Sequence, residues 1–92
     1  MIIISDTSPL VCLLHLNKIS ILKDLFVNVI IPTAVFNELI SAKIIDETFL
    51  QSNPFIQLKT PLNKKEVEEL RKILDAGESE AIVLSKELNA DL

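Results

Sequence analysis

Short apolar runs recur along the chain and end at polar or turn-forming residues. Residues 2–5 ("IIIS") and residues 28–31 ("NVII") are runs of this kind, and residues 54–59 ("PFIQLK") contain a third. Continuous apolar runs of this length are typical of strands that are buried on both faces of a parallel sheet. The pattern therefore predicts three buried strands.

Between these runs, apolar residues recur with the spacing of a helix. Residues 7–16 ("TSPLVCLLHL") predict a helix in which Ser8 is the N-cap and Pro9 occupies the first helical position. Residues 18–26 ("KISILKDLF") continue the same helical rhythm. Two further helical stretches are predicted over residues 33–42 and 46–53, the second capped by Asp46.

The clearest helical pattern lies in the second half of the chain, over residues 63–77. Asn63 followed three residues later by Glu66 resembles a capping box. Gly77 is the only glycine in the chain, and we expect it to end this helix. A last helix is predicted over residues 78–89.

Strands that alternate with helices predict an α/β fold of three layers, a parallel sheet flanked by helices, in a single domain over residues 1–92. The hydrophobic content of 49% and the mean hydropathy of +0.41 are sufficient for a core. No run approaches the roughly 18 consecutive apolar residues that cross a membrane. The single cysteine, Cys12, excludes a disulfide framework and indicates a cytoplasmic protein.

The net charge of −4 argues against a protein that coats duplex DNA through bulk electrostatics. It is compatible with an enzyme that handles nucleic acid through bound cations, because the metal then supplies the positive charge.

Asp6 directly follows the first predicted strand. Open parallel sheets bind ligands at the carboxyl ends of their strands, so Asp6 lies at the expected binding edge. Acids are also common at helix starts, and position alone leaves both interpretations open. The neighbouring Thr7 and Ser8 are able to hydrogen-bond the Asp6 carboxylate or to cap the following helix.

Three glutamates lie near the same edge in the later part of the chain. In the helix predicted over residues 33–42 the apolar residues gather on one face, and Glu38 falls off that face, which favours a solvated side chain. Glu78 lies at the border of the inward face of the last helix, where an acid needs a partner, either a cation or the helix N-terminus. Glu80 points away from that face and is predicted to be solvated.

Three blocks of the sequence, "IIISDTSPL", "VIIPTAVFNEL" and "LDAGESEAIVLSKELNADL", together resemble the PIN domain family. The resemblance covers nearly the whole chain and extends to the VapC-like group, whose third block reads Gly-Glu-x-Glu-Ala-Ile. It implies a metal-dependent endoribonuclease that hydrolyses phosphodiester bonds in single-stranded or loop RNA. It further implies the toxin component of a toxin–antitoxin pair, with a cognate antitoxin protein as partner.

Carried over residue by residue, the resemblance assigns the catalytic and metal-binding roles to three acids: Asp6, Glu38 and Glu78. They would hold Mg²⁺ or Mn²⁺, and Thr7 and Ser8 match the hydroxyl positions beside the first acid. Glu80 also matches the motif, so it stays an alternative to Glu78, although the helical wheel favours Glu78.

The family pattern continues after "ADL" with a fourth strand and a further acid. The resemblance therefore predicts a PIN-like domain that is incomplete at its C-terminus, lacks the last strands and has weakened or absent activity. The first strand would then be an unpaired apolar edge, which predicts a homodimer or higher oligomer. The alternative to the ribonuclease is a catalytically inactive PIN remnant that acts only in protein–protein association.

Overall fold

The computed structural model describes residues 2–5, 7–25 and 28–90, with side chains at residues 3–5, 10–24 and 28–90. In chain order the elements are β1 (Ile2–Ile4), α1 (Thr7–His15), α2 (Ser20–Leu25), β2 (Asn28–Pro32), α3 (Thr33–Ser41), α4 (Phe49–Ser52), β3 (Ile56–Lys59), α5 (Lys64–Leu70) and α6 (Ala76–Leu88). Helices therefore separate the strands, as the hydrophobic pattern predicts.

The strands of the described residues form one parallel sheet in the order β1-β2-β3. Ile3 of β1 lies opposite Val29 of β2, and Ile31 of β2 lies opposite Leu58 of β3. The central position of β2 explains why its residues 29–32 are all buried. The predicted α/β fold, a parallel sheet flanked by helices, is confirmed.

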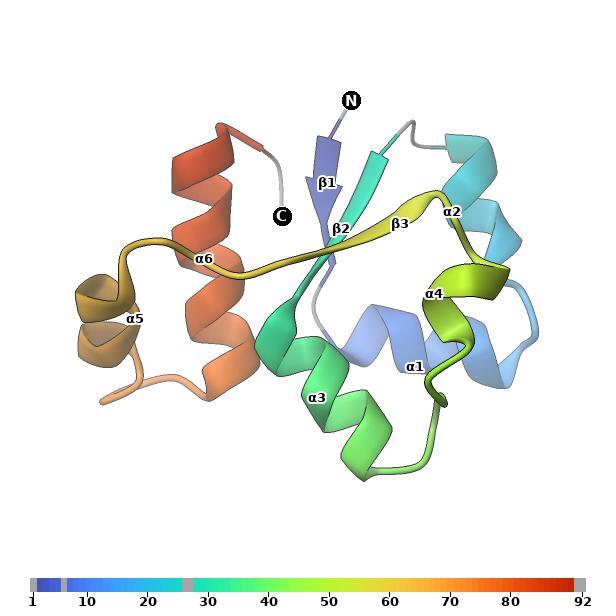
Figure 1. Cartoon of the computed structure of the whole chain (residues 1–92), viewed down its shortest axis with the longest axis horizontal. Coiled ribbons are helices and arrows are strands. Elements are labelled where there is room, and N and C mark those ends of the chain that lie inside the picture. The colour runs from blue at the N-terminus through green and yellow to red at the C-terminus, as the bar shows by residue number, and fades with distance from the viewer. Residues whose placement is uncertain (1, 6, 26–27, 91–92) are drawn as a thin grey trace.

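The two faces of the sheet carry different parts of the core, because successive side chains of a strand point to opposite faces. Val29 and Ile31 pack into a cluster whose other buried members are Leu10, Val35, Leu39, Ile45, Phe49 and Ile56. Ile4 and Ile30 belong to a second cluster on the other face, where α6 covers them. Figure 1 shows the same division, with α5 and α6 on one side of the sheet and α1 to α4 on the other.

Asn17 separates two helices where the sequence pattern predicts one continuous helical rhythm. Its φ angle of 55° is left-handed, a conformation that asparagine adopts more readily than most residues. The N–H of Lys18 donates to the carbonyl oxygen of Leu13 at 2.8 Å, and the N–H of Asn17 donates to that of Leu14 at 3.1 Å. This Schellman arrangement satisfies the last carbonyls of α1 and turns the chain into α2. Apolar periodicity alone carries no sign of such a turn.

The start of α1 also differs from the prediction. The helix begins at Thr7, so Ser8 lies within its first turn and is not the N-cap. The first four N–H groups of a helix have no partner inside the helix, so Pro9 is tolerated at a later position of the first turn than the one predicted. No helix of the described residues is long and apolar enough to cross a membrane.

The start of α5 is predicted correctly and its end is not. Asn63 Oδ1 accepts a hydrogen bond from the N–H of Glu66 at 3.1 Å, and Asn63 Nδ2 donates to the Glu66 carboxylate at 3.2 Å. The helix ends at Leu70, well before Gly77. Gly77 lies buried in the first turn of α6, which the Asp75 side chain caps.

Candidate functional site

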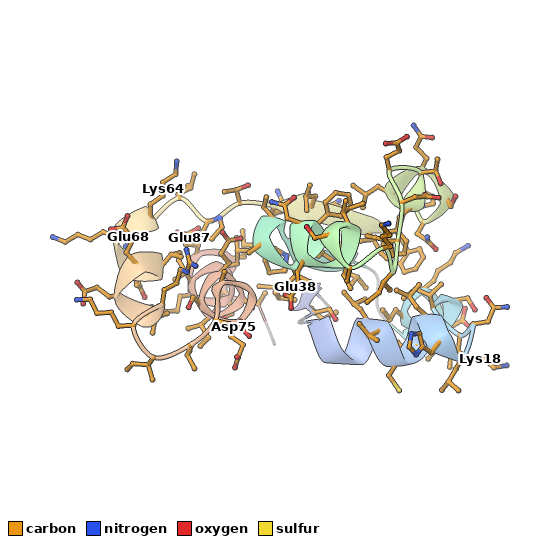
Figure 2. All side chains as sticks on the ribbon, turned by 90° about the horizontal axis from the view of Figure 1, so that it is seen from below. Lys18, Glu38, Lys64, Glu68, Asp75 and Glu87 are labelled. Atoms are coloured by element: carbon orange, nitrogen blue, oxygen red, sulfur yellow. The ribbon has the colours of Figure 1, made fainter. Side chains whose placement is uncertain are left out.

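The edge of the sheet at which the three strands end is called the carboxyl edge below. The helix α3 begins there, directly after β2, and α6 packs against α3. The hydroxyl groups of Thr33 and Thr60 are hydrogen-bonded at 2.5 Å, and Thr33 Oγ1 donates to the carbonyl oxygen of Lys59 at 3.2 Å. These contacts tie the end of β3 to the start of α3. Figure 2 views the molecule from the carboxyl edge.

Asp6, the first predicted acid, lies outside the described residues. It is the second residue after β1 in the sequence. Thr7 and Ser8 open α1, and their side chains also lie outside the description. The assignments of these three residues stay predictions.

Glu38 lies on α3, and its side chain is exposed as the helical periodicity predicts. Val35 and Leu39 of the same helix are fully buried, so the exposed position of Glu38 follows from the face that α3 turns to the sheet. Figure 2 shows Glu38 on the side of α3 that faces α1. An exposed carboxylate at this place is accessible to a substrate as large as RNA.

Glu78 lies in the first turn of α6 and is half-buried. Its backbone N–H donates to Asp75 Oδ1 at 2.8 Å, so Asp75 is the N-cap and Glu78 stands at the third position of the helix. A carboxylate is favoured here by the partial positive charge of the helix start. The half-buried position at the border of the inward face agrees with the helical wheel.

The helical wheel predicts a solvated Glu80, and this prediction is wrong. Its Oε1 accepts a hydrogen bond of 2.9 Å from the backbone N–H of Ala34, in the first turn of α3. The N-cap position of α3 is occupied by Pro32, which supplies no capping side chain, so Glu80 serves as a cap from a distant part of the sequence. The prediction failed because α6 packs against α3 and α5 as well as the sheet.

Ser79, between the two glutamates, was not singled out by the sequence pattern. It is fully buried, and its hydroxyl is the buried side-chain polar atom without a hydrogen-bond partner among the described residues. A buried hydroxyl without a partner costs about 1–3 kcal/mol, so the Ser79 hydroxyl is expected to destabilise the fold. A wheel built from the large apolar residues alone assigns no role to such a small side chain.

The structure packs α3, which carries Glu38, against α6, which carries Glu78. A search of the described residues finds no group of three or more histidine, cysteine, aspartate or glutamate side chains able to hold a metal ion. Glu38 and Glu78 offer carboxylate oxygens, the ligand type that Mg²⁺ and Mn²⁺ prefer. The chemistry of these donors therefore fits a hard divalent cation.

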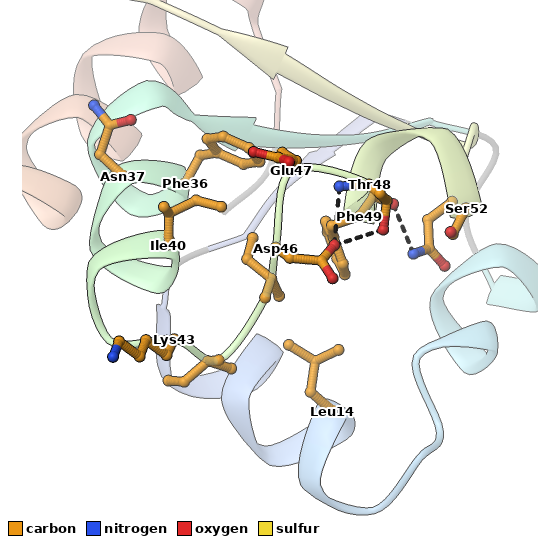
Figure 3. Close-up of a pocket in the computed structure, with 13 residues that line it drawn as sticks. Leu14, Phe36, Asn37, Ile40, Lys43, Asp46, Glu47, Thr48, Phe49 and Ser52 are labelled. Carbon is orange, nitrogen blue, oxygen red and sulfur yellow. Dashed lines mark hydrogen bonds between the residues drawn. The ribbon is translucent and has the colours of Figure 1, made fainter.

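A hollow of about 990 Å³ lies away from these acids, between α1, α3 and α4 (Figure 3). Its lining includes the apolar side chains of Leu14, Phe36 and Ile40, while neither Glu38 nor Glu78 contributes to it. At its rim, the Thr48 hydroxyl and the Thr48 backbone N–H donate to Asp46 and lower the pKa of its carboxyl group. The hollow is therefore not part of the candidate site.

Comparison with protein families gives one match that covers nearly the whole chain. The DUF3368 family model, described as a PIN domain, matches residues 2–92. No curated protein and no solved structure gives a significant match. The family match agrees with the resemblance carried by the three sequence blocks.

Proposed function

Because this chain belongs to the PIN-domain family, we propose that it is a metal-dependent endoribonuclease. The family is one of nucleases, and its members generally use divalent metal ions. The finer assignment is to the VapC type, in which the protein is the toxin of a toxin–antitoxin pair.

The observation that carries the proposal is the junction of α3 and α6 at the carboxyl edge of the sheet. Glu38 comes from α3 and Glu78 from the first turn of α6, and the two helices are in contact. In the proposal Asp6, which follows β1 in the sequence, lies at the same edge. The proposed site thus takes three acids from three separate parts of the sequence and places them at one edge, where parallel sheets bind ligands.

The hydrogen bond from Ala34 to Glu80 supports Glu78 as the third acid. One carboxylate oxygen of Glu80 accepts a hydrogen bond at the start of α3, and this contact holds α6 against that helix. Residues two apart on a helix point in widely different directions, so Glu78 and Glu80 cannot both serve one site in the same way. In this assignment Glu80 positions the two helices and Glu78 is the metal ligand.

We assign Asp6, Glu38 and Glu78 to the binding of Mg²⁺ or Mn²⁺, with Thr7 and Ser8 as hydrogen-bonding neighbours of Asp6. When bound, such an ion activates a water molecule and stabilises the charge that develops on the phosphodiester. The carboxylates of this chain repel one another when the site is empty, and a cation relieves that repulsion. The exposure of Glu38 leaves the site accessible from solvent.

The proposed substrate is single-stranded or loop RNA, whose backbone is accessible to a shallow site. The proposed partners are a cognate antitoxin protein and a second copy of this chain. The homodimer rests on β1, which is an edge strand of the sheet within the described residues and carries three isoleucines. The proposed location is the cytoplasm.

The test compares three glutamate-to-glutamine substitutions on α3 and α6. Glu78→Gln and Glu38→Gln are expected to lower RNA cleavage with Mg²⁺ or Mn²⁺ by at least about 100-fold. They are also expected to weaken Mn²⁺ binding measured by isothermal titration calorimetry. Glu80→Gln is expected to retain Mn²⁺ binding while lowering thermal stability.

Equal loss of Mn²⁺ affinity in Glu78→Gln and Glu80→Gln would contradict the division of roles between the two acids. If the unmodified protein cleaves no RNA with either metal, and Asp6→Asn changes nothing, the alternative of a catalytically inactive association module is favoured instead.

A further inference from the structure

A second hollow lies between α5 and the junction of α3 with α6. It has a volume of about 190 Å³, and its lining consists of Thr60, Pro61, Lys64, Val67, Glu68, Arg71 and Glu80. We call it the α5 groove. Building on the ribonuclease proposed above, we propose that the α5 groove binds backbone phosphates of the RNA strand beside the bond that is cleaved, through Lys64 and Arg71.

The two cations share one face of α5. Lys64 is the first residue of the helix and Arg71 stands at its C-cap with helical backbone angles. Seven residues correspond to nearly two full turns, so both side chains lie along one line, about 10 Å apart along the axis. A line of two cations matches the repeating charge of an extended phosphodiester backbone.

Lys64 and Arg71, unlike Lys72 and Lys86, have no anionic partner among the described residues. Lys72 pairs with Glu69 at 3.3 Å, and Lys86 pairs with Glu66. Within the described part of the chain no ion pair or side-chain hydrogen bond involves Lys64 or Arg71, and both side chains are exposed. Their positive charge is thus available to a ligand.

The groove also contains two carboxylates, and they differ in effect. Glu80 directs a carboxylate oxygen to the start of α3, where Oε1 accepts a hydrogen bond from the Ala34 N–H. Glu68 is exposed and lies on α5 between the two cations, so it opposes an anion in the groove. This opposition gives the proposal a direct test, because removal of the Glu68 charge must strengthen RNA binding if the groove receives a phosphate.

Two residues of the α5 groove connect it to the start of α3, the helix that carries Glu38. Glu80 lines the groove and holds α3, and Thr60 lines the groove and bonds Thr33 at the start of α3. In Figure 2, Lys64 and Glu68 lie on α5 beside α6, while Glu38 lies farther inward on α3. In the proposed path the RNA strand passes over Glu38 and Glu78, crosses α6 and contacts Lys64 and Arg71.

The experiment measures binding of a fluorescent single-stranded oligoribonucleotide of about 12 nucleotides by fluorescence anisotropy, without divalent metal, over a range of KCl concentrations. Lys64→Ala and Arg71→Ala are each expected to weaken binding about 3- to 10-fold. Each is expected to reduce the slope of log affinity against log salt by about 0.7, the value for loss of one phosphate contact to a single strand. Glu68→Gln is expected to tighten binding.

Lys72→Ala is the matched control, because Lys72 carries the same charge just beyond the same helix but is paired with Glu69 and does not line the groove. Equal weakening by Lys72→Ala and Lys64→Ala would overturn the proposal in favour of general charge attraction. Displacement of the RNA by inorganic phosphate at matched ionic strength would overturn it in favour of a site for free phosphate. Unchanged RNA binding in all variants would also overturn the proposal. If the unmodified protein binds RNA as expected but does not cleave it, the proposed ribonuclease activity is contradicted and the groove is not.

Discussion

The face of the sheet that α1 to α4 cover is held by a broad apolar cluster, whereas the face that α6 covers has a small one. The first cluster joins buried residues from α1, β2, α3, α4 and β3. The buried members of the second are Ile4 and Ile30 on the sheet with Ala81 and Leu84 on α6. The two helical layers therefore differ in what attaches them to the same strands.

On the side of α5 and α6, polar contacts add to the attachment that the small apolar cluster provides. Glu80 accepts from the N–H of Ala34, and Glu87 accepts from the backbone N–H groups of Leu62 and Asn63 at 2.8–3.1 Å. Of the two described acids proposed as metal ligands, Glu78 therefore belongs to the layer whose attachment depends more on charge, and Glu38 belongs to the layer held by apolar contacts. The layer of α5 and α6 is expected to open at lower free energy than the rest of the fold.

The largest expected change in the free energy of unfolding comes from a substitution in the broad apolar cluster. Leu39 is fully buried between α3 and the sheet, so Leu39→Ala leaves a cavity and is expected to destabilise the protein by about 2–5 kcal/mol. Urea unfolding followed by circular dichroism measures the change. Leu62→Ala is the control, since Leu62 is 88% exposed, and a loss comparable to that of Leu39→Ala would contradict the role given to the cluster.

The next effect falls on the contact between α6 and α3. Glu80→Ala removes the acceptor of the Ala34 N–H and is expected to cost about 1–2 kcal/mol, because hydrogen bonds to charged groups are stronger than neutral ones. Since the bond carries a charge, high salt is expected to narrow the gap between the variant and the unmodified protein. A loss that is independent of salt in the same urea experiment would argue that Glu80 acts by packing.

A smaller effect is expected from the cap of α6. Asp75→Ala removes the acceptor of the Glu78 N–H and is expected to cost about 1 kcal/mol. The loss concentrates at the start of α6, so hydrogen exchange of amides near Glu78 is expected to accelerate while amides of β2 keep their protection. Asp75→Asn is the control, because asparagine caps nearly as well. Equal acceleration in β2 and α6 would indicate that the two layers open together.

The buried hydroxyl of Ser79 is expected to give a gain in stability. Ser79→Ala removes a polar atom that has no partner among the described residues, and a gain of up to about 1 kcal/mol is expected. Thermal unfolding by calorimetry measures it. A stabilised variant with reduced RNA cleavage would indicate that the hydroxyl is kept for the site, whereas a destabilised variant would show that the hydroxyl is satisfied in solution.

The sequence predicted the fold well because the strands are apolar runs and the helices carry a clear periodicity. It predicted the ends of helices poorly, since these depend on single residues. Asn17 ends α1 in a left-handed conformation, and Lys43 and Asn89 do the same after α3 and α6, while the single glycine lies inside a helix. Glycine, the residue most often found just after a helix, therefore predicted the wrong end for α5.

For the candidate site, local periodicity predicted the environment of Glu38 and Glu78 and failed for Glu80. A helical wheel represents one buried face, but α6 is packed against the sheet, α3 and α5 together. The partner of Glu80 lies 46 residues earlier in the chain, and no local pattern contains that relation. The convergence of Asp6 with the two glutamates stays a prediction for the same reason.

The smallest expected effect is a dependence on pH in the layer held by apolar contacts. Hydrogen bonds from the Thr48 hydroxyl and then the Thr48 backbone N–H lower the pKa of Asp46. A carboxyl group whose pKa is lowered by folding stabilises the folded state above its pKa in the unfolded chain. That contribution disappears as the pH falls through the lowered pKa of the folded state. NMR titration of Asp46 is expected to show this lowered pKa, and Thr48→Ala is expected to raise it. An unchanged Asp46 pKa in Thr48→Ala would show that the hydrogen bond from the Thr48 hydroxyl does not persist in solution.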